Sequence, residues 1–98
     1  VLMFDYADND RERVFFIKDG ELLHLHILEE RISDFIKKDS RDVVLDLEGL
    51  SRFDSQSLAS LIRIKRKLDS LDRTLRIINY NEAIFRVIEL AGMEDFLL

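Results

Sequence analysis

The sequence predicts an α/β fold, with a small mixed β-sheet and helices packed against it in the order β-β-α-β-α-β-α. Short runs of β-branched and aromatic residues alternate with longer segments whose apolar residues recur at helical spacing. No proline and only three glycines interrupt the chain. Its 98 residues suit one domain, which we expect to span residues 1–98.

Two candidate strands open the chain. Residues 1–6 are apolar enough for a strand, residues 7–13 suit a polar turn, and VFFI at residues 14–17 has the composition of a strand. Asp19-Gly20 then signals a turn. ELLHLH at residues 21–26 is compatible either with a returning strand or with a loop that leads into a helix.

Helical periodicity begins at Leu25. A first helix ends at residues 39–41, and its inner face consists of Leu25, Leu28, Ile32, Phe35 and Ile36. VVLDL at residues 43–47 is almost wholly apolar, which is typical of a central strand buried on both faces.

The second half repeats this alternation. A helix that starts near Asp54 or Ser55 has an inner stripe of Leu58, Leu61, Ile62, Leu68 and Leu71. LRII at residues 75–78 is the next strand. Asn79 and Asn81 can cap a last helix with an inner face of Ile84, Val87, Ile88 and Ala91, and Gly92 suits a left-handed C-cap. Residues 93–98 form an apolar tail.

Composition excludes several classes of protein. Fifteen basic against twenty acidic residues argue against nucleic acid as a partner, because phosphate contacts need a basic surface. The absence of cysteine excludes disulfides, thiol chemistry and cysteine-based zinc sites. The apolar runs are too short to span a membrane, and the first residues lack the order of a signal peptide. We therefore expect a cytoplasmic protein that does not bind membranes.

Few residues suggest catalysis or metal binding. His24 and His26 would share one face of a strand, but no third ligand has matching spacing, so a polar strand edge is favoured over a metal site. Asp46 ends the buried strand and is interpreted as a structural or loop-capping group. No nucleophile, base and acid are placed together, so we expect neither enzymatic activity nor a cofactor.

The segment DSQS, residues 54–57, permits two interpretations. Aspartate and serine are preferred N-caps, so this segment can simply begin a helix. A helix N-terminus also tolerates an anion, so a serine here can carry a phosphate with little strain. The residues alone favour the cap and leave the phosphorylation site open.

The stretch VVLDLEGLSRFDSQSLASLIRIKRKL, residues 43–68, resembles the signature of STAS domains, the fold of bacterial anti-sigma factor antagonists. Their pattern is an apolar strand, a short loop, Asp-Ser-x-Gly-Leu and a helix. LRIINYNEAIFRVIELAGMEDFL is similar to the strand, turn and helix that follow in the family, and DGEL at residues 19–22 resembles its Gly-x-Leu. The resemblance covers roughly residues 14–98.

This resemblance implies a partner-switching function in signal transduction and transcription regulation. In the family, the serine after the aspartate is phosphorylated by a partner that is both a serine kinase and an anti-sigma factor. The unphosphorylated antagonist binds the anti-sigma factor, and a phosphatase restores that form. Position assigns phosphorylation to Ser55, with Ser57 as the fallback. The implied partner-binding residues are Ser51, Arg52, Asp54, Ser55, Ser57 and Leu23.

The sequence departs from the family pattern at three places. Ser57 replaces the glycine after Asp-Ser-x, and Leu23 replaces an acidic residue on the family's partner-binding face. Leu71-Asp72-Arg73 replaces a glycine pair after the second helix. The first two departures support an alternative function, a non-phosphorylated STAS scaffold or ligand-sensing interaction domain.

Overall fold

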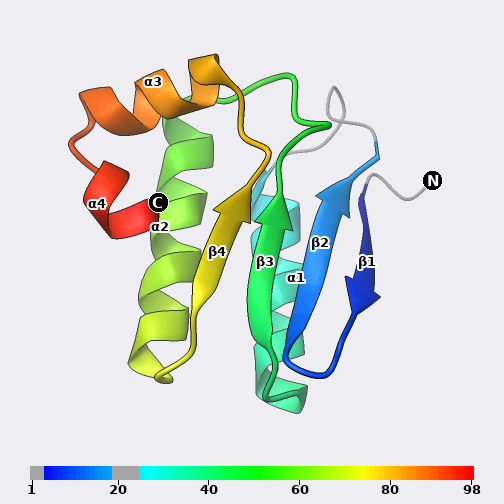
Figure 1. Cartoon of the computed structure of the whole chain (residues 1–98). Coiled ribbons are helices and arrows are strands. Elements are labelled where there is room, and N and C mark those ends of the chain that lie inside the picture. Colours follow the sequence, from blue (N-terminus) through cyan, green and yellow to red (C-terminus); the bar gives the residue numbers. More distant parts are fainter. Residues whose placement is uncertain (1–3, 19–24) are drawn as a thin grey trace.

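The structure is a computed structural model that describes residues 4–18 and 25–98. Its order is β-β-α-β-α-β-α, as predicted, with one further short helix at the end (Figure 1). The elements are β1 (Phe4–Asp8), β2 (Glu12–Ile17), α1 (Leu25–Lys38), β3 (Asp42–Asp46), α2 (Ser55–Ser70), β4 (Leu75–Ile78), α3 (Glu82–Leu90) and α4 (Glu94–Leu97).

The four strands form one mixed sheet in the order β1-β2-β3-β4. β1 and β2 pair antiparallel, whereas β2, β3 and β4 are parallel, with Val14 opposite Val44 and Val44 opposite Arg76. In Figure 1, α1 and α2 lie behind the sheet, and α3 lies beyond the carboxyl ends of the parallel strands. The same end holds the start of α2, so the loops that follow β3 and β4 meet there.

The core lies between the sheet and the two long helices. All five residues predicted for the inner face of the first helix are buried, and β3 adds Val43 and Leu45 to this core, with 1% and 0% exposure. Val44 lies between them, points to the opposite face of the sheet and is also 0% exposed, so this central strand is buried on both faces, as predicted.

The predicted polar turn at residues 7–13 is too long. Ala7 and Asp8 belong to β1, Glu12 and Arg13 belong to β2, and residues 9–11 alone make the turn. The Arg13 guanidinium donates to Asp8 Oδ1 at 2.7 Å across the antiparallel pair. Charged residues therefore extend both strands, because their partners lie on the neighbouring strand.

The predictions for the inner faces of the second and third helices are wrong for the residue at the end of each helix. Leu71 is 49% exposed, and Ala91 is also exposed. Both are C-cap residues, so the helix ends before they can point inward. Ile64 and Ser60 are buried on α2 instead, and the predicted tail contains α4 with Leu97 in the core.

Left-handed residues end both helices. Gly92 has φ +68°, which confirms its predicted role. Asp72 has φ +56°, although a glycine pair is expected here from the family pattern. Aspartate is one of the few non-glycine residues that tolerate this conformation, so the missing glycines do not prevent the turn. Asn81 caps α3, as predicted, by accepting the Ile84 N–H at 2.8 Å.

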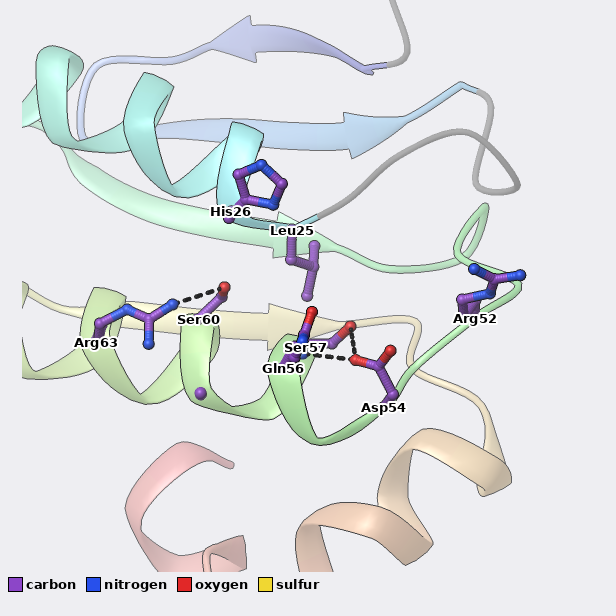
Figure 2. A pocket seen from close by; sticks show the side chains of 9 residues that line it. Leu25, His26, Arg52, Asp54, Gln56, Ser57, Ser60 and Arg63 are labelled. Atoms are coloured by element: carbon purple, nitrogen blue, oxygen red, sulfur yellow. Dashed lines mark hydrogen bonds between the residues drawn. The ribbon is translucent and has the colours of Figure 1, made fainter.

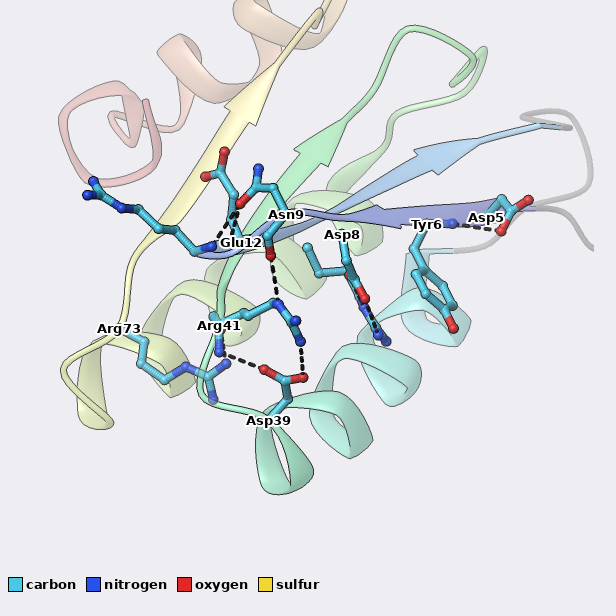
Figure 3. A network of polar contacts seen from close by, with 10 residues as sticks. Asp5, Tyr6, Asp8, Asn9, Glu12, Asp39, Arg41 and Arg73 are labelled. Atoms are coloured by element: carbon cyan, nitrogen blue, oxygen red, sulfur yellow. Dashed lines mark hydrogen bonds and ion pairs between the residues drawn. The ribbon is translucent and has the colours of Figure 1, made fainter.

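A polar network fastens the opposite end of the molecule (Figure 3). Arg41 donates through Nε to the carbonyl of Asn9 at 2.8 Å and pairs with Asp39 at 2.6 Å. Arg73 donates to the carbonyl of Ile36 at 2.9 Å near the end of α1. These contacts join the hairpin, α1 and the turn after α2.

In the described ranges, no helix is long and apolar enough to cross a membrane.

Candidate functional site

The DSQS segment forms the N-terminus of α2, and Asp54 is its N-cap. The backbone of Asp54 is extended, and its Oδ1 accepts the N–H of Ser57 at 2.9 Å. The Ser57 hydroxyl also donates to Asp54 Oδ1, at 3.1 Å. The cap interpretation is therefore confirmed, with Asp54 as the capping residue.

The cap also sets the charge of Asp54. The Ser57 N–H that donates to this carboxylate is the main reason why the pKa of Asp54 is lowered. A hydrogen bond to the ionised form favours that form. Asp54 therefore remains a carboxylate at neutral pH, immediately before Ser55.

The two candidate serines differ in their surroundings. Ser55 is the first residue of α2, is exposed, and forms no side-chain hydrogen bond to a described residue. Ser57 is half-buried, and its hydroxyl is engaged by Asp54. The accessible hydroxyl of this segment is therefore that of Ser55.

The loop between β3 and α2 places two more predicted partner-binding residues on the surface. Leu47 and Leu50 anchor the loop in the core with 1% and 3% exposure, whereas Ser51 and Arg52 are exposed. Gly49 lies against the backbone of Ile17, the last residue of β2. The loop thus rests on the strand that leads into residues 19–24.

Part of the predicted site lies outside the described residues, namely Leu23, His24 and the Asp19-Gly20 turn. Leu25 and His26 are helical, so the alternative in which residues 21–26 form a strand is wrong for these two positions. The shared strand face proposed for His24 and His26 is lost with it. Among the described residues, no cluster of His, Cys, Asp or Glu could hold a metal ion.

A pocket of about 270 Å³ separates the first turns of α1 and α2 (Figure 2). It brings together Arg52, Asp54 and Ser57 from the predicted site. Sequence reasoning missed its other lining residues, which are Leu25, His26, Gln56, Ala59, Ser60 and Arg63. The available signal was helical spacing, because residues 56, 60 and 63 follow one face of a helix.

Arg63 fixes one wall of this pocket. Its Nε and Nη2 donate to the two carboxylate oxygens of Glu29, both at 2.9 Å, and Nη2 also donates to the buried Ser60 hydroxyl at 3.2 Å. The hydrogen bonds from Arg63 lower the pKa of Glu29. This bidentate pair joins α1 to α2 beside the DSQS segment.

Asp46 has the capping role that was predicted for it. Its Oδ1 accepts the N–H of Glu48 at 3.0 Å, and its Oδ2 accepts the amide of Asn79 at 3.1 Å. Asn79 therefore links the loops after β3 and β4 and does not cap α3, in contrast to the prediction. Both carboxylate oxygens of Asp46 therefore accept hydrogen bonds from nearby residues of the chain.

Comparison with known proteins finds a matching family model, a related protein and similar solved structures. The model of the STAS domain family matches residues 18–98. An anti-sigma-B factor antagonist from Staphylococcus aureus strain NCTC 8325 is 26% identical, over 89% of this chain and 83% of that protein. A crystal structure of a candidate anti-sigma factor antagonist from Thermotoga maritima has a TM-score of 0.79 at 23% identity, covering 97% of this chain and 83% of that one. An NMR structure of TM1081, the same protein, also gives a TM-score of 0.79, with 23% identity over 100% of this chain and 79% of that one.

Proposed function

Because this chain belongs to the STAS domain family, we propose that it is an anti-sigma factor antagonist in a cytoplasmic partner-switching module. Its partner is an anti-sigma factor with serine kinase activity, which phosphorylates Ser55, and a phosphatase reverses the modification. The name of the Staphylococcus aureus relative supports the class of partner. The chain itself contributes a surface and an acceptor hydroxyl, and it catalyses no step.

The observation that carries this proposal is the exposed Ser55 hydroxyl at the first position of α2. A kinase must reach the acceptor oxygen, and the surrounding surface leaves it accessible. The N–H groups and the positive end of the α2 dipole favour an anion at this position. A phosphate can therefore be added here without displacing a buried group.

The same arrangement explains how the modification would act as a switch. A phosphoserine carries about −1.5 to −2 charges at neutral pH. Together with the ionised Asp54, it converts this exposed corner into a strongly negative patch. A partner that docks on unphosphorylated Ser55 would then face like-charge repulsion and lost hydrogen bonds. The fold remains unchanged while the affinity falls.

Ser57 is a poorer acceptor for two reasons. Its hydroxyl donates to Asp54 Oδ1 at 3.1 Å, so its use would break part of the α2 cap. A phosphate on Ser57 would also lie beside the Asp54 carboxylate, where repulsion is strong at short distance. We therefore retain Ser55 as the acceptor and Ser57 as the fallback. Ser51, Arg52 and Asp54 complete the proposed partner surface, with Leu23 from the segment outside the described residues.

The test is phosphopeptide mass spectrometry on the protein isolated from the cells that express it, during growth and under stress. We expect one phosphoryl group on Ser55 whose occupancy changes with the condition. The Ser55→Ala variant should abolish both the phosphate and the regulation, whereas Ser70→Ala, which alters an exposed serine at the far end of α2, should leave both intact.

Other outcomes separate the alternatives. Phosphate on Ser57 would keep the switch and move the acceptor. If no phosphate is found in any condition and Ser55→Ala has no effect, the phosphorylation switch is wrong. The non-phosphorylated STAS scaffold or ligand-sensing domain would then be the better function.

A further inference from the structure

The helix α3 has apolar residues on its outer face as well as on its inner face. Ile84 and Ile88 point into the core with 1% and 0% exposure. Ala83 and Leu90 are exposed, Leu90 to 81%, and Val87 lies between them at spacings of four and three residues. Val87 was predicted for the inner face but is only half-buried, so part of its side chain reaches the surface. Among the described residues, no other large hydrophobic side chain is as exposed as Leu90. We call Ala83, Val87 and Leu90 the α3 stripe.

The stripe lies in an acidic part of the chain. Residues 79–98 contain the carboxylates Glu82, Glu89, Glu94 and Asp95, against Arg86 as the only basic residue. In the described structure, none of these four carboxylates forms an ion pair, whereas Asp8 and Glu29 are paired with arginines. Glu94 is half-buried, so the carboxylates that α3 itself presents to solvent are those of Glu82 and Glu89, against one arginine, Arg86.

We propose that the α3 stripe docks into an apolar groove of a protein partner, and that the rim of this groove carries lysine and arginine. Anchors at positions i, i+4 and i+7 are how an amphipathic helix binds in a groove. The unpaired carboxylates make a basic rim the complementary one. This contact goes beyond the proposed function, because it involves neither Ser55 nor a phosphate.

The negative charge of α3 also decides which kind of partner can cover the α3 stripe. A second copy of this chain would bring its own Glu82 and Glu89 against those of the first, and like charges facing each other oppose association. A neutral apolar groove would cover Leu90 but leave the carboxylates without partners. A basic-rimmed groove satisfies both features of α3.

Two synthetic amphipathic helical peptides serve as probes. Both have the same length and the same leucine positions, and their polar positions are all lysine in one and all glutamate in the other. In NMR titrations of the ¹⁵N-labelled chain, we expect the lysine peptide to cause saturable shifts in amides of α3. The glutamate peptide should bind at least about tenfold more weakly, because its charge opposes that of the α3 surface.

Matched variants test the residues. Leu90→Ser should weaken binding of the lysine peptide about tenfold, as expected for a central apolar contact. Leu71→Ser removes another exposed leucine, at the end of α2, and should leave the affinity unchanged. The double variant Glu82→Gln/Glu89→Gln should weaken binding and reduce its salt dependence, whereas Glu30→Gln on α1 should not.

Three results would overturn the proposal. The first is no saturable binding of the lysine peptide. The second is an equal effect of Leu71→Ser and Leu90→Ser, which would indicate general attraction to a chain of net charge −5. The third is self-association in sedimentation experiments that Leu90→Ser abolishes, because a second copy would then cover the stripe. Phosphate mapping at Ser55 is unaffected by these outcomes, so the two proposals fail separately.

Discussion

Asp54 holds Ser57 through two hydrogen bonds to the same oxygen, one from the Ser57 N–H at 2.9 Å and one from its hydroxyl at 3.1 Å. STAS antagonists resemble this chain in the Asp-Ser pair but have glycine at the position of Ser57. The serine here adds a second bond to the cap and draws its hydroxyl toward Asp54. The additional hydroxyl at residue 57 is therefore engaged in the cap, and Ser55 is the serine of this segment with an accessible hydroxyl.

Negative charge at residues 55 and 57 should have different effects on stability. We expect Ser55→Asp to retain the melting temperature of the parent chain, because residue 55 is exposed and a carboxylate suits the first turn of a helix. Ser57→Asp should lower it, because a second carboxylate would face Asp54 and the hydroxyl bond would be lost. Thermal unfolding followed by circular dichroism distinguishes the two. A large drop for Ser55→Asp would show that residue 55 cannot carry an anion without strain.

The cap should also make stability depend on pH. The folded state lowers the pKa of Asp54, chiefly through the Ser57 N–H, so the ionised carboxylate stabilises the fold. This contribution is complete above about pH 4, the ordinary pKa of aspartate, and is lost as the pH falls through the lower pKa of the folded state. In urea unfolding between about pH 2 and 6, the stability gap between the parent and Asp54→Ala should therefore shrink on acidification.

Ser57→Ala is the control for this pH dependence. It removes the hydroxyl but keeps the N–H that is the leading cause of the lowered pKa. The stability gap between Ser57→Ala and the double variant Ser57→Ala/Asp54→Ala should thus still shrink at low pH. If it were already independent of pH, the hydroxyl bond and not the N–H bond would govern the ionisation of Asp54.

Neighbouring leucines on α2 should differ in their contribution to folding. Leu61 is 0% exposed within the core, so Leu61→Ala should lower the free energy of unfolding by about 2–5 kcal/mol. Leu58 is half-buried beside the core, so Leu58→Ala should cost less. Chemical denaturation of both variants measures the difference. Equal losses would mean that Leu58 is as confined as Leu61.

Regular periodicity made much of the fold predictable. The five inner residues of α1 recur at helical spacing over a helix that continues past them, and all five are buried. Leu71 and Ala91 fit the same pattern on paper but lie where the helices stop. Their exposure depends on the left-handed turns at Asp72 and Gly92, and only the second is marked by a glycine.

The candidate site also has a part that the sequence predicted and a part that it did not. Residue type and position alone indicated that a cap lies at Asp54 or Ser55, and the structure selects Asp54, whose capping contact to Ser57 spans three residues. The pocket beside it depends on how α1 packs against α2. The Glu29–Arg63 pair that fixes its wall joins residues 34 positions apart, and no local pattern specifies which helix faces meet. The pocket could therefore be identified only from the tertiary structure.

Gly49 should control the position of the loop between β3 and α2. A Cβ at this position would overlap the carbonyl oxygen of Ile17 and lie 3.2 Å from its carbonyl carbon. Both atoms belong to backbone, so neither can move aside as a flexible side chain could, and the loop itself must shift. We therefore expect Gly49→Ala to displace Ser51 and Arg52, which NMR would detect as shifts in amides 50–55.

Gly92→Ala is the matched control for this displacement. A Cβ on Gly92 meets nothing within 4 Å, but its φ of +68° strains alanine. Gly92→Ala should therefore lower the melting temperature and leave amides 50–55 unchanged. If Gly49→Ala also left them unchanged, the contact with Ile17 would not position the loop. If both variants moved them equally, the loop would be responding to global destabilisation and not to the steric contact at Gly49.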